Sequence, residues 1–326
     1  MTLDVKNGQP PEYISKVEIL AQALLKNRGL IFLGAGASRP DDGQESLPTA
    51  GELAQEMADA CRLPFPAYLP LSTIAFYYES RYNRPYLNGF LQKKIDRDDL
   101  PIPTTMQLVA EIAACLEEHG RQCFIVTTNY DCFIERAYEA RMKKKPTVIV
   151  YRGGWNPHDS STRLHVGFDG DAEFWHPTQS TTIYKMHGCI KDVTEATQNE
   201  SCLVITDEDY INFITNAFSQ DDKKRLLQYT RGVIALSNIL FLGYSLTDSN
   251  FRVIFKATAE ARKNDSYAIQ YLNGNKAAIG QFELTRWTAT ASFWQTKKVQ
   301  IIDAHARDFV AQLLSEIRRQ IGNVGH

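Results

Sequence analysis

The segment LIFLGAGAS, which ends at Ser38, is the first part of the sequence whose residue types suggest chemistry. An apolar run leads directly into Gly34, Ala35 and Gly36, whose small side chains leave the backbone uncovered. Such a turn lets a phosphate group approach main-chain N–H groups. Arg39 stands where the dinucleotide fingerprint has its third glycine, so an ordinary dehydrogenase is disfavoured. The alternative interpretation is that the glycines only form a tight turn.

Three later apolar runs also end in polar clusters. TTNYD carries Asn129 and Asp131, IYKMHG carries His187, and FLGYSL carries Gly243, Tyr244 and Ser245. Taken singly, an Asn or Asp at such a position can merely cap the next helix. A lone histidine there is more often a structural hydrogen-bonding group than a catalyst. Because the clusters recur at the ends of successive predicted strands, we expect them to share one ligand site.

The elements that carry these clusters alternate between strands and helices. Several strands are continuous apolar runs, which is typical of a parallel sheet covered on both faces. The sequence therefore predicts an α/β fold with a Rossmann-like parallel sheet, in which ligands bind beyond the carboxyl ends of the strands. A helix near residues 14–25 is expected to stop at Gly29. Thr49 and Glu52 have the spacing of a capping box for a helix that runs to about Arg62.

The chain is expected to be a single domain over residues 1–326 with two additions. Residues 63–104 are predicted to be a helical insertion and residues 152–182 a long, polar surface excursion. The first addition is rich in aromatic side chains, namely Phe65, Tyr68, Phe76, Tyr77, Tyr78, Tyr82, Tyr86 and Phe90. Aromatic residues are enriched in interface cores, so we expect a homo-oligomer. The alternative is that they form a local core of their own.

Composition excludes several classes of protein. The net charge of −2 gives no electrostatic footprint for nucleic acid. Six cysteines without a C-x-x-C pair predict that no metal is bound, and dilute unpaired cysteines are typical of a cytoplasmic protein. No signal peptide is visible at the start of the sequence, and no apolar segment is long enough to span a membrane.

Taken in order, the motifs resemble those of the sirtuins, and within them the divergent sirtuin-like domains of bacterial antiphage defence. The matching pieces are GAGAS, SLPTAGEL, TTNYD, YKMHG, LVITDEDY and FLGYSLTDSNF, between about residues 30 and 255. The resemblance implies a Rossmann-like fold, NAD as the substrate and cleavage of the bond between nicotinamide and ribose.

The resemblance also implies roles for individual residues. Gly34, Ala35, Gly36 and Ser38 correspond to the family's glycine loop, which holds the pyrophosphate and the adjoining ribose. Asn129 and Asp131 correspond to groups beside the nicotinamide ribose and carboxamide, and His187 to the catalytic histidine. Gly243, Tyr244 and Ser245 correspond to the second loop, on the phosphate and adenosine side. Thr49 lies where the family's loop covers the nicotinamide pocket.

Departures from the family pattern indicate which reaction to expect. Protein-deacylating sirtuins carry four zinc-binding cysteines and a segment that clamps an acyl-lysine peptide, and this chain lacks both patterns. Water is then the expected acceptor, which gives an NAD glycohydrolase that depletes NAD during phage infection. Nicotinamide leaves as a neutral molecule through an oxocarbenium-like transition state, so oriented dipoles and a general base are the groups needed.

Other functions remain open at the level of sequence. A protein deacylase would consume NAD together with acyl-lysine, and a sensor of NAD or ADP-ribose would bind without turnover. A cyclase would differ only in the acceptor. The resemblance further suggests a ring-forming P-loop ATPase or an Argonaute as a partner protein.

Overall fold

Seven parallel strands form one sheet in the order β3-β4-β2-β1-β5-β6-β7. The computed structural model describes residues 13–40, 44–63, 69–151, 181–217, 232–246, 251–253, 255–256, 262, 264–271 and 281–324. The strands are β1 (Gly29–Leu33), β2 (Phe124–Thr127), β3 (Thr147–Val150), β4 (Thr182–Lys185), β5 (Asn238–Leu242), β6 (Ser266–Gln270) and β7 (Val299–Asp303). The predicted α/β fold with a parallel sheet is confirmed.

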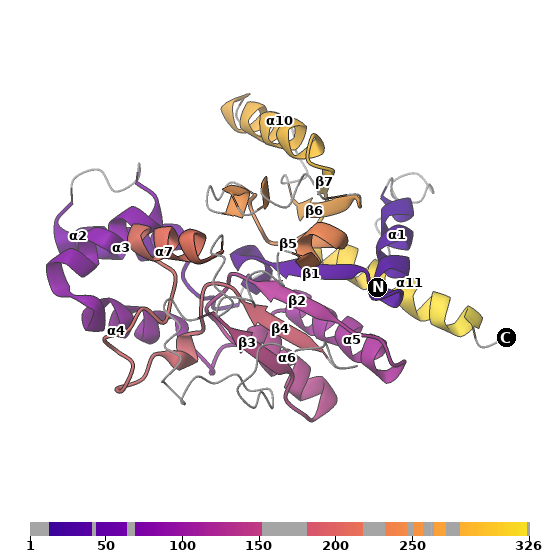
Figure 1. Ribbon diagram of the computed structural model, residues 1–326, viewed down its shortest axis with the longest axis horizontal. Coiled ribbons are helices and arrows are strands. Elements are labelled where there is room, and N and C mark those ends of the chain that lie inside the picture. Colours follow the sequence, from indigo (N-terminus) through magenta and orange to yellow (C-terminus); the bar gives the residue numbers. More distant parts are fainter. Residues whose placement is uncertain are drawn as a thin grey trace.

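Helices surround this sheet (Figure 1). They are α1 (Ile14–Leu25), α2 (Ala50–Cys61), α3 (Leu71–Tyr82), α4 (Arg84–Ile95), α5 (Thr104–Glu118), α6 (Phe133–Met142), α7 (Asp207–Ala217), α10 (Gln281–Gln295) and α11 (Ala306–Val324). Two short 3₁₀ helices, η2 (Ala35–Ser38) and η5 (Ile190–Asp192), follow β1 and β4. None of the helices in the described part of the chain is both long and apolar enough to cross a bilayer.

The alternation of side chains along β1 shows how the sheet is covered. Ile31 and Leu33 pack into a core with α1, α5, α6 and α11, whereas Leu30 and Phe32 pack into a second core on the opposite face. The second core includes Phe213 from α7 and Trp294 from α10. Because β1 is buried on both faces, its sequence is a continuous apolar run.

Several predicted helix boundaries agree with the structure. Thr49 and Glu52 form the reciprocal capping box at the start of α2. Gly120 follows α5 with a φ of +66°. The expectation that Gly29 stops the first helix is wrong, because α1 ends at Leu25 and Gly29 opens β1. Asn27, with a φ of +54°, supplies the left-handed residue between them.

The predicted helical insertion contains two regular helices, α3 and α4. Both pack with α2 into a third core, which also takes in Leu203 and Ile205 from the segment before α7. These elements lie together at one end of the sheet (Figure 1). The aromatic residues of the insertion divide accordingly: Tyr78 is buried, whereas Phe76, Tyr77 and Tyr86 are exposed.

Two expectations fall wholly or mainly on residues that the structure does not describe. Phe65 and Tyr68 lie outside the described residues, as does the predicted surface excursion except at its end. Thr181 and Thr182 are described, and Thr182 begins β4. The division of residues 1–326 into one domain with two additions therefore stays a prediction.

Candidate active site

The sheet brings four polar clusters to one edge. Leu33, the last residue of β1, is in register with Thr127 of β2 and Leu242 of β5. Thr127 is in turn in register with Lys185 of β4. Because the strands are parallel, the segments after these residues all leave from the carboxyl edge. From β1 the strand order continues toward β2 on one side and toward β5 on the other. The carboxyl ends of these strands are therefore the topological switch point, where α/β sheets bind ligands.

The glycines of the first turn are needed because two turns approach each other closely. A Cβ atom at Gly34 would lie 2.6 Å from the carbonyl oxygen of Gly243, and one at Gly36 would lie 2.9 Å from Gly243 Cα. Gly243 itself has a φ of +62°, and a Cβ there would lie 1.9 Å from the nitrogen of Ala37. The Gly36 N–H donates to the Gly243 carbonyl at 2.9 Å. Close backbone packing thus accounts for these glycines, and phosphate binding by the Gly34–Ser38 turn stays a prediction.

Ser38, Asn129 and Asp131 form one buried hydrogen-bond network. Asn129 Nδ2 donates to Ser38 Oγ at 2.9 Å and to the Gly34 carbonyl at 3.1 Å. Ser38 Oγ donates to Asp131 Oδ2 at 2.8 Å. The three side chains are only 7–8% exposed. The structure therefore joins the predicted glycine turn to the predicted Asn-Asp pair.

The backbone beneath Asn129 is also fixed. Thr127 Oγ1 donates to the Leu33 carbonyl at 3.1 Å and accepts from the Asn129 N–H at 3.0 Å. With its Nδ2 directed to the first turn, the Asn129 side chain leaves Oδ1 buried, and among the described residues this oxygen has no hydrogen-bond partner. A buried acceptor without a partner costs free energy unless a ligand or water supplies the donor.

Asp131 uses both carboxylate oxygens. Its Oδ1 accepts from the Phe133 N–H at 3.0 Å, which forms an Asx turn just before α6. The N-cap of α6 is Cys132, without a side-chain cap, so Asp131 does not cap the helix in the ordinary sense. Its Oδ2 accepts from Ser38, so the same carboxylate also belongs to the polar network.

Lys185 is a functional candidate that the sequence reasoning missed. It is the last residue of β4, is fully buried, and donates through Nζ to the Asp131 carbonyl and to Glu135 Oε1, the latter at 2.8 Å. Burial lowers the pKa of Lys185, but the nearby Cys189, Glu135, Cys132 and Asp131 outweigh burial and hold its pKa well above the ordinary value. A charged lysine beneath the Asp131 loop therefore stiffens the site, and a lysine within an apolar strand gives no sequence signal for that role.

His187 is positioned by aromatic residues of α7. It is 5% exposed, and its ring meets Tyr210 and Phe213 of α7 edge to face, with centroid distances of 5.2 and 5.5 Å. Its carbonyl accepts from the Val204 N–H at 3.0 Å. The Met186 N–H donates to the Thr127 carbonyl, so the chain at His187 leaves the sheet next to the loop that carries Asn129. The described contacts thus fix the plane of the ring with aromatic neighbours.

The remaining predicted residues have mainly structural contacts. The Thr49 side chain accepts from the Glu52 N–H at 3.1 Å, and its described hydrogen bonds are those of the capping box. The Tyr244 ring packs into the core against Phe32 at 5.0 Å, whereas Ser245 is exposed. Gln270 Nε2 donates to the carbonyls of both Tyr244 and Ser245. Their predicted roles in nucleotide binding remain untested.

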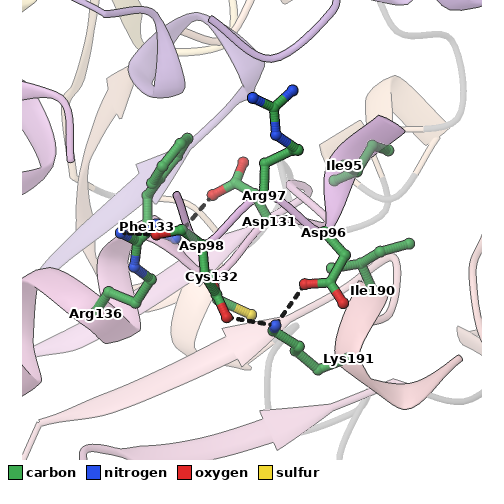
Figure 2. A pocket seen from close by; sticks show the side chains of 10 residues that line it. All are labelled: Ile95, Asp96, Arg97, Asp98, Asp131, Cys132, Phe133, Arg136, Ile190 and Lys191. Atoms are coloured by element: carbon green, nitrogen blue, oxygen red, sulfur yellow. Dashed lines mark hydrogen bonds and ion pairs between the residues drawn. The ribbon is translucent and has the colours of Figure 1, made fainter. Parts of the chain in front are cut away.

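A surface hollow lies beside Asp131, on the side of η5 (Figure 2). Its lining includes Asp96, Asp98 and Lys191, and the Lys191 ammonium contacts Asp96 Oδ1 at 2.5 Å and Asp98 Oδ2 at 2.7 Å. Cys132 also lines it. Asp131 lines it as well, whereas Gly34, Asn129 and His187 do not, so the hollow adjoins the predicted nucleotide site only at Asp131.

One group of side chains among the described residues could hold a metal ion. The ligand atoms of Cys132, Glu135 and Cys189 all lie within 4.8 Å of one another. The expectation that no metal is bound stays a prediction.

The fold is that of a doubly wound, parallel α/β protein. The model of the SIR2-like domain family matches residues 124–302, and the chain belongs to this family. It is 29% identical over 241 residues to the NAD(+) hydrolase ThsA of Enterococcus faecium. The alignment covers 73% of this chain but 41% of that protein, so the chain spans well under half of its relative's length.

Solved structures of Sir2 proteins are also similar to this chain. One, from work on the mechanism and regulation of Sir2 enzymes, has a TM-score of 0.47 at 14% identity and covers 96% of this chain and 100% of its own. Another, Sir2Af2 bound to a myristoylated histone peptide, has a TM-score of 0.45 at 13% identity and covers 95% and 99%.

Proposed function

We propose that this protein is an NAD glycohydrolase, which cleaves NAD to nicotinamide and ADP-ribose. The observation that carries the proposal is the buried Asn129 Oδ1, held without a described partner by a network that includes Ser38 and Asp131. The relative ThsA is named an NAD(+) hydrolase, which supports the same reaction for this chain.

The residues present suit NAD as the substrate. Asn129 Oδ1 is an acceptor that needs a donor, and a ribose hydroxyl or an attacking water provides one. The network fixes the amide so that Oδ1, rather than Nδ2, is presented. The site lies at the switch point of the sheet, where nucleotides bind in folds of this class.

In the proposed mechanism these groups stabilise the oxocarbenium-like ribose and direct a nucleophile to its anomeric carbon. The leaving nicotinamide is neutral and takes no proton from the protein. Asn129 orients the hydroxyl or water beside the anomeric carbon, and the Asp131 carboxylate stabilises the positive charge that develops there. A neutral His187 imidazole accepts the proton released by the nucleophile, an effect typically of about 10²–10⁴-fold in rate.

The test is to incubate the purified chain with NAD and separate the products by chromatography. We expect nicotinamide and ADP-ribose in equal amounts. Asn129→Ala and His187→Ala should each lower the rate at least ~100-fold, as for the loss of one positioned catalytic group, while the fold is kept. His119→Ala is the matched control, because its Nδ1 contacts only the nearby Cys115 carbonyl among the hydrogen bonds described for it.

Other products would identify another member of the same class. Cyclic ADP-ribose would indicate a cyclase, turnover only with an acyl-lysine peptide would indicate a deacylase, and NAD binding without turnover would indicate a sensor. Each of these results contradicts the glycohydrolase proposal. A rate near that of the native protein in a folded His187→Ala or Asn129→Ala variant would remove that residue from the mechanism.

Further parts of the proposal concern the cellular setting. We infer a cytoplasmic protein from its six cysteines, none of which forms a disulfide. NAD depletion in antiphage defence, a homo-oligomer and a partner of the P-loop ATPase or Argonaute type are implied by the resemblance to defence sirtuins.

A further inference from the structure

Two cysteines close in sequence to Asp131 and His187 face each other. Cys132 Sγ and Cys189 Sγ lie 3.5 Å apart, although 57 positions separate them in the sequence. All six cysteines of the chain are described and none forms a disulfide. Cys132 immediately follows Asp131, and Cys189 lies two residues after His187. The pair therefore joins the two loops that carry the proposed catalytic groups.

We propose that Cys132 and Cys189 are a redox modification site, which a peroxide oxidises to a disulfide that lowers NAD cleavage. The effect on cleavage rests on the proposed function, whereas formation of the disulfide does not.

The surroundings of the pair favour oxidation. The hydrogen bond from Cys132 and the fully buried Lys185 ammonium lower the pKa of Cys189, whereas that hydrogen bond and burial raise the pKa of Cys132, so Cys189 supplies the reactive thiolate. Cys132 is partly exposed and lines the surface hollow beside η5 (Figure 2). Cys189 is 6% exposed and is not among the residues that line the hollow.

The reaction balances with hydrogen peroxide as the oxidant. The Cys189 thiolate attacks one peroxide oxygen, the O–O bond breaks, and a sulfenic acid and hydroxide form. The hydroxide takes a proton and leaves as water. The Cys132 sulfur then attacks the sulfenic sulfur, the S–S bond forms, and the S–O bond breaks to release a second water. The two thiols lose two electrons and two protons, and one peroxide is reduced to two waters.

The geometry predicts that the disulfide weakens the site. An S–S bond is about 2.05 Å long, so the sulfurs must approach each other from their present separation of 3.5 Å. Cys132 is bonded in the chain to Asp131, whose carboxylate is placed by Ser38 at 2.8 Å and by the Phe133 N–H at 3.0 Å. A displacement of about 1 Å at a catalytic group can cost about 100-fold in rate. Oxidation should therefore disturb Asp131 rather than leave it in place.

A structural metal is the competing use of the same atoms. Cys132, Cys189 and Glu135 would supply three ligands. Glu135 Oε1, however, already accepts from the Lys185 ammonium at 2.8 Å, and that buried cation opposes a second positive charge. The observed contacts favour a dithiol over a metal centre.

The experiment uses the full chain, reduced and then freed of reductant. It is treated with graded hydrogen peroxide, digested without reduction, and examined by mass spectrometry for a Cys132–Cys189 crosslink. The same samples are assayed for NAD cleavage before and after dithiothreitol. We expect the crosslink to form, cleavage to fall about 10-fold to 100-fold in line with a displaced catalytic group, and dithiothreitol to restore both.

Serine variants distinguish oxidation of this cysteine pair from oxidative damage elsewhere in the protein. Cys132→Ser and Cys189→Ser should resist peroxide, whereas Cys115→Ser, which removes a buried thiol on α5, should respond as the native chain does. Loss of cleavage in Cys189→Ser equal to that in the native chain would overturn the inference. The crosslink map of the native chain decides the site even if a serine variant fails to fold.

The outcomes also separate this inference from the proposed function. Absence of the crosslink in oxidised native protein, or stoichiometric zinc in the reduced protein, overturns the modification site whatever the activity. A crosslink with unchanged NAD cleavage overturns its regulatory effect. If the reduced chain forms the crosslink on oxidation but never cleaves NAD, the site stands and the proposed function fails.

Discussion

Ser38 Oγ donates a hydrogen bond to Asp131 Oδ2 at 2.8 Å, although the two residues are 93 positions apart. Ser38 belongs to the short η2 helix after β1, and Asp131 to the loop after β2. The same hydroxyl accepts from Asn129 Nδ2 at 2.9 Å, so it uses both its donor and an acceptor within the network. This one side chain sets the position of two proposed catalytic residues at once.

We predict that Ser38→Ala lowers kcat for NAD cleavage about 10-fold to 100-fold, in line with a misplaced catalytic group. The alanine leaves Asn129 Nδ2 with only the Gly34 carbonyl and removes a donor from Asp131 Oδ2. Steady-state kinetics measures the effect, with Ser201→Ala at an exposed position as the control. Unchanged kcat in a folded Ser38→Ala variant would show that the network does not position the reacting groups.

The sequence predicts much of this edge because its motifs follow apolar strands. Once parallel strands are inferred, Asn129, Asp131 and His187 must leave from the same side as the first turn, and the structure places them there. Helix starts with a strong local signal are equally predictable. Thr206 and Asp209, for example, have capping-box spacing and form a reciprocal cap of α7, in which the Asp209 N–H donates to Thr206 Oγ1 at 3.1 Å.

Features that depend on distant contacts could not be predicted. Helix α10 was missed because its threonine-rich and aromatic-rich sequence shows no apolar stripe at helical spacing. The close approach of Gly34 to Gly243 links two turns more than 200 positions apart, and only the register of β1 with β5 shows it. Lys185 and the Cys132–Cys189 pair likewise become meaningful only when neighbouring strands are placed side by side.

A second prediction concerns the ion pair between α4 and α7. Arg84 Nη1 contacts Asp209 Oδ2 at 2.9 Å, and Nη2 donates to the Leu203 carbonyl at 2.8 Å. The two side chains are 7% and 6% exposed. Because Arg84→Ala leaves a buried carboxylate without its cation, we expect the free energy of unfolding to fall by about 3–5 kcal/mol. Urea unfolding followed by circular dichroism measures it.

Matched variants distinguish the cost of an uncompensated buried charge from the cost of lost side-chain packing. Arg81→Ala removes an exposed arginine near the end of α3 and should cost much less. Arg84→Ala/Asp209→Asn removes both charges while an amide oxygen can still accept from the Ile205 and Thr206 N–H groups. The double variant should therefore be more stable than Arg84→Ala alone. Equal or lower stability would refute the buried-charge explanation.

A third prediction concerns the expected homo-oligomer. Phe76, Tyr77 and Tyr86 are 41%, 42% and 65% exposed on α3 and α4, whereas Tyr78 is buried. If the exposed rings form an interface between copies, Phe76→Ser/Tyr86→Ser should shift the mass toward the monomer in native mass spectrometry across a dilution series. Ile19→Ser, at a 41% exposed position on α1, is the control. A native chain that is monomeric at micromolar concentration would contradict oligomerisation.

The final prediction concerns acid stability and Glu117. This carboxylate, 7% exposed at the end of α5, accepts from the Thr181 N–H and Thr181 Oγ1, both at 3.0 Å, and from Tyr138 and Lys144. Burial raises the pKa of Glu117, but hydrogen bonds from Lys144, Tyr138 and Thr181 outweigh burial and lower its pKa below the ordinary value. The contacts therefore tie α5 and α6 to the start of β4 most strongly when the carboxylate is charged.

A pKa that is lower in the folded chain than in the unfolded chain makes stability depend on pH in a defined direction. The contribution of Glu117 is fully present above the unfolded pKa of about 4.3 and is lost as the pH falls through the folded value. Glu117→Gln should therefore reduce the free energy of unfolding at pH 7 and flatten its slope below about pH 5, by at most about 1.4 kcal/mol per pH unit. Urea unfolding of both proteins from pH 7 to well below the unfolded pKa of about 4.3 measures the difference. Glu118→Gln, at the neighbouring and 45% exposed carboxylate, should leave the slope nearly unchanged, and a slope in Glu117→Gln identical to that of the native chain would refute the assignment.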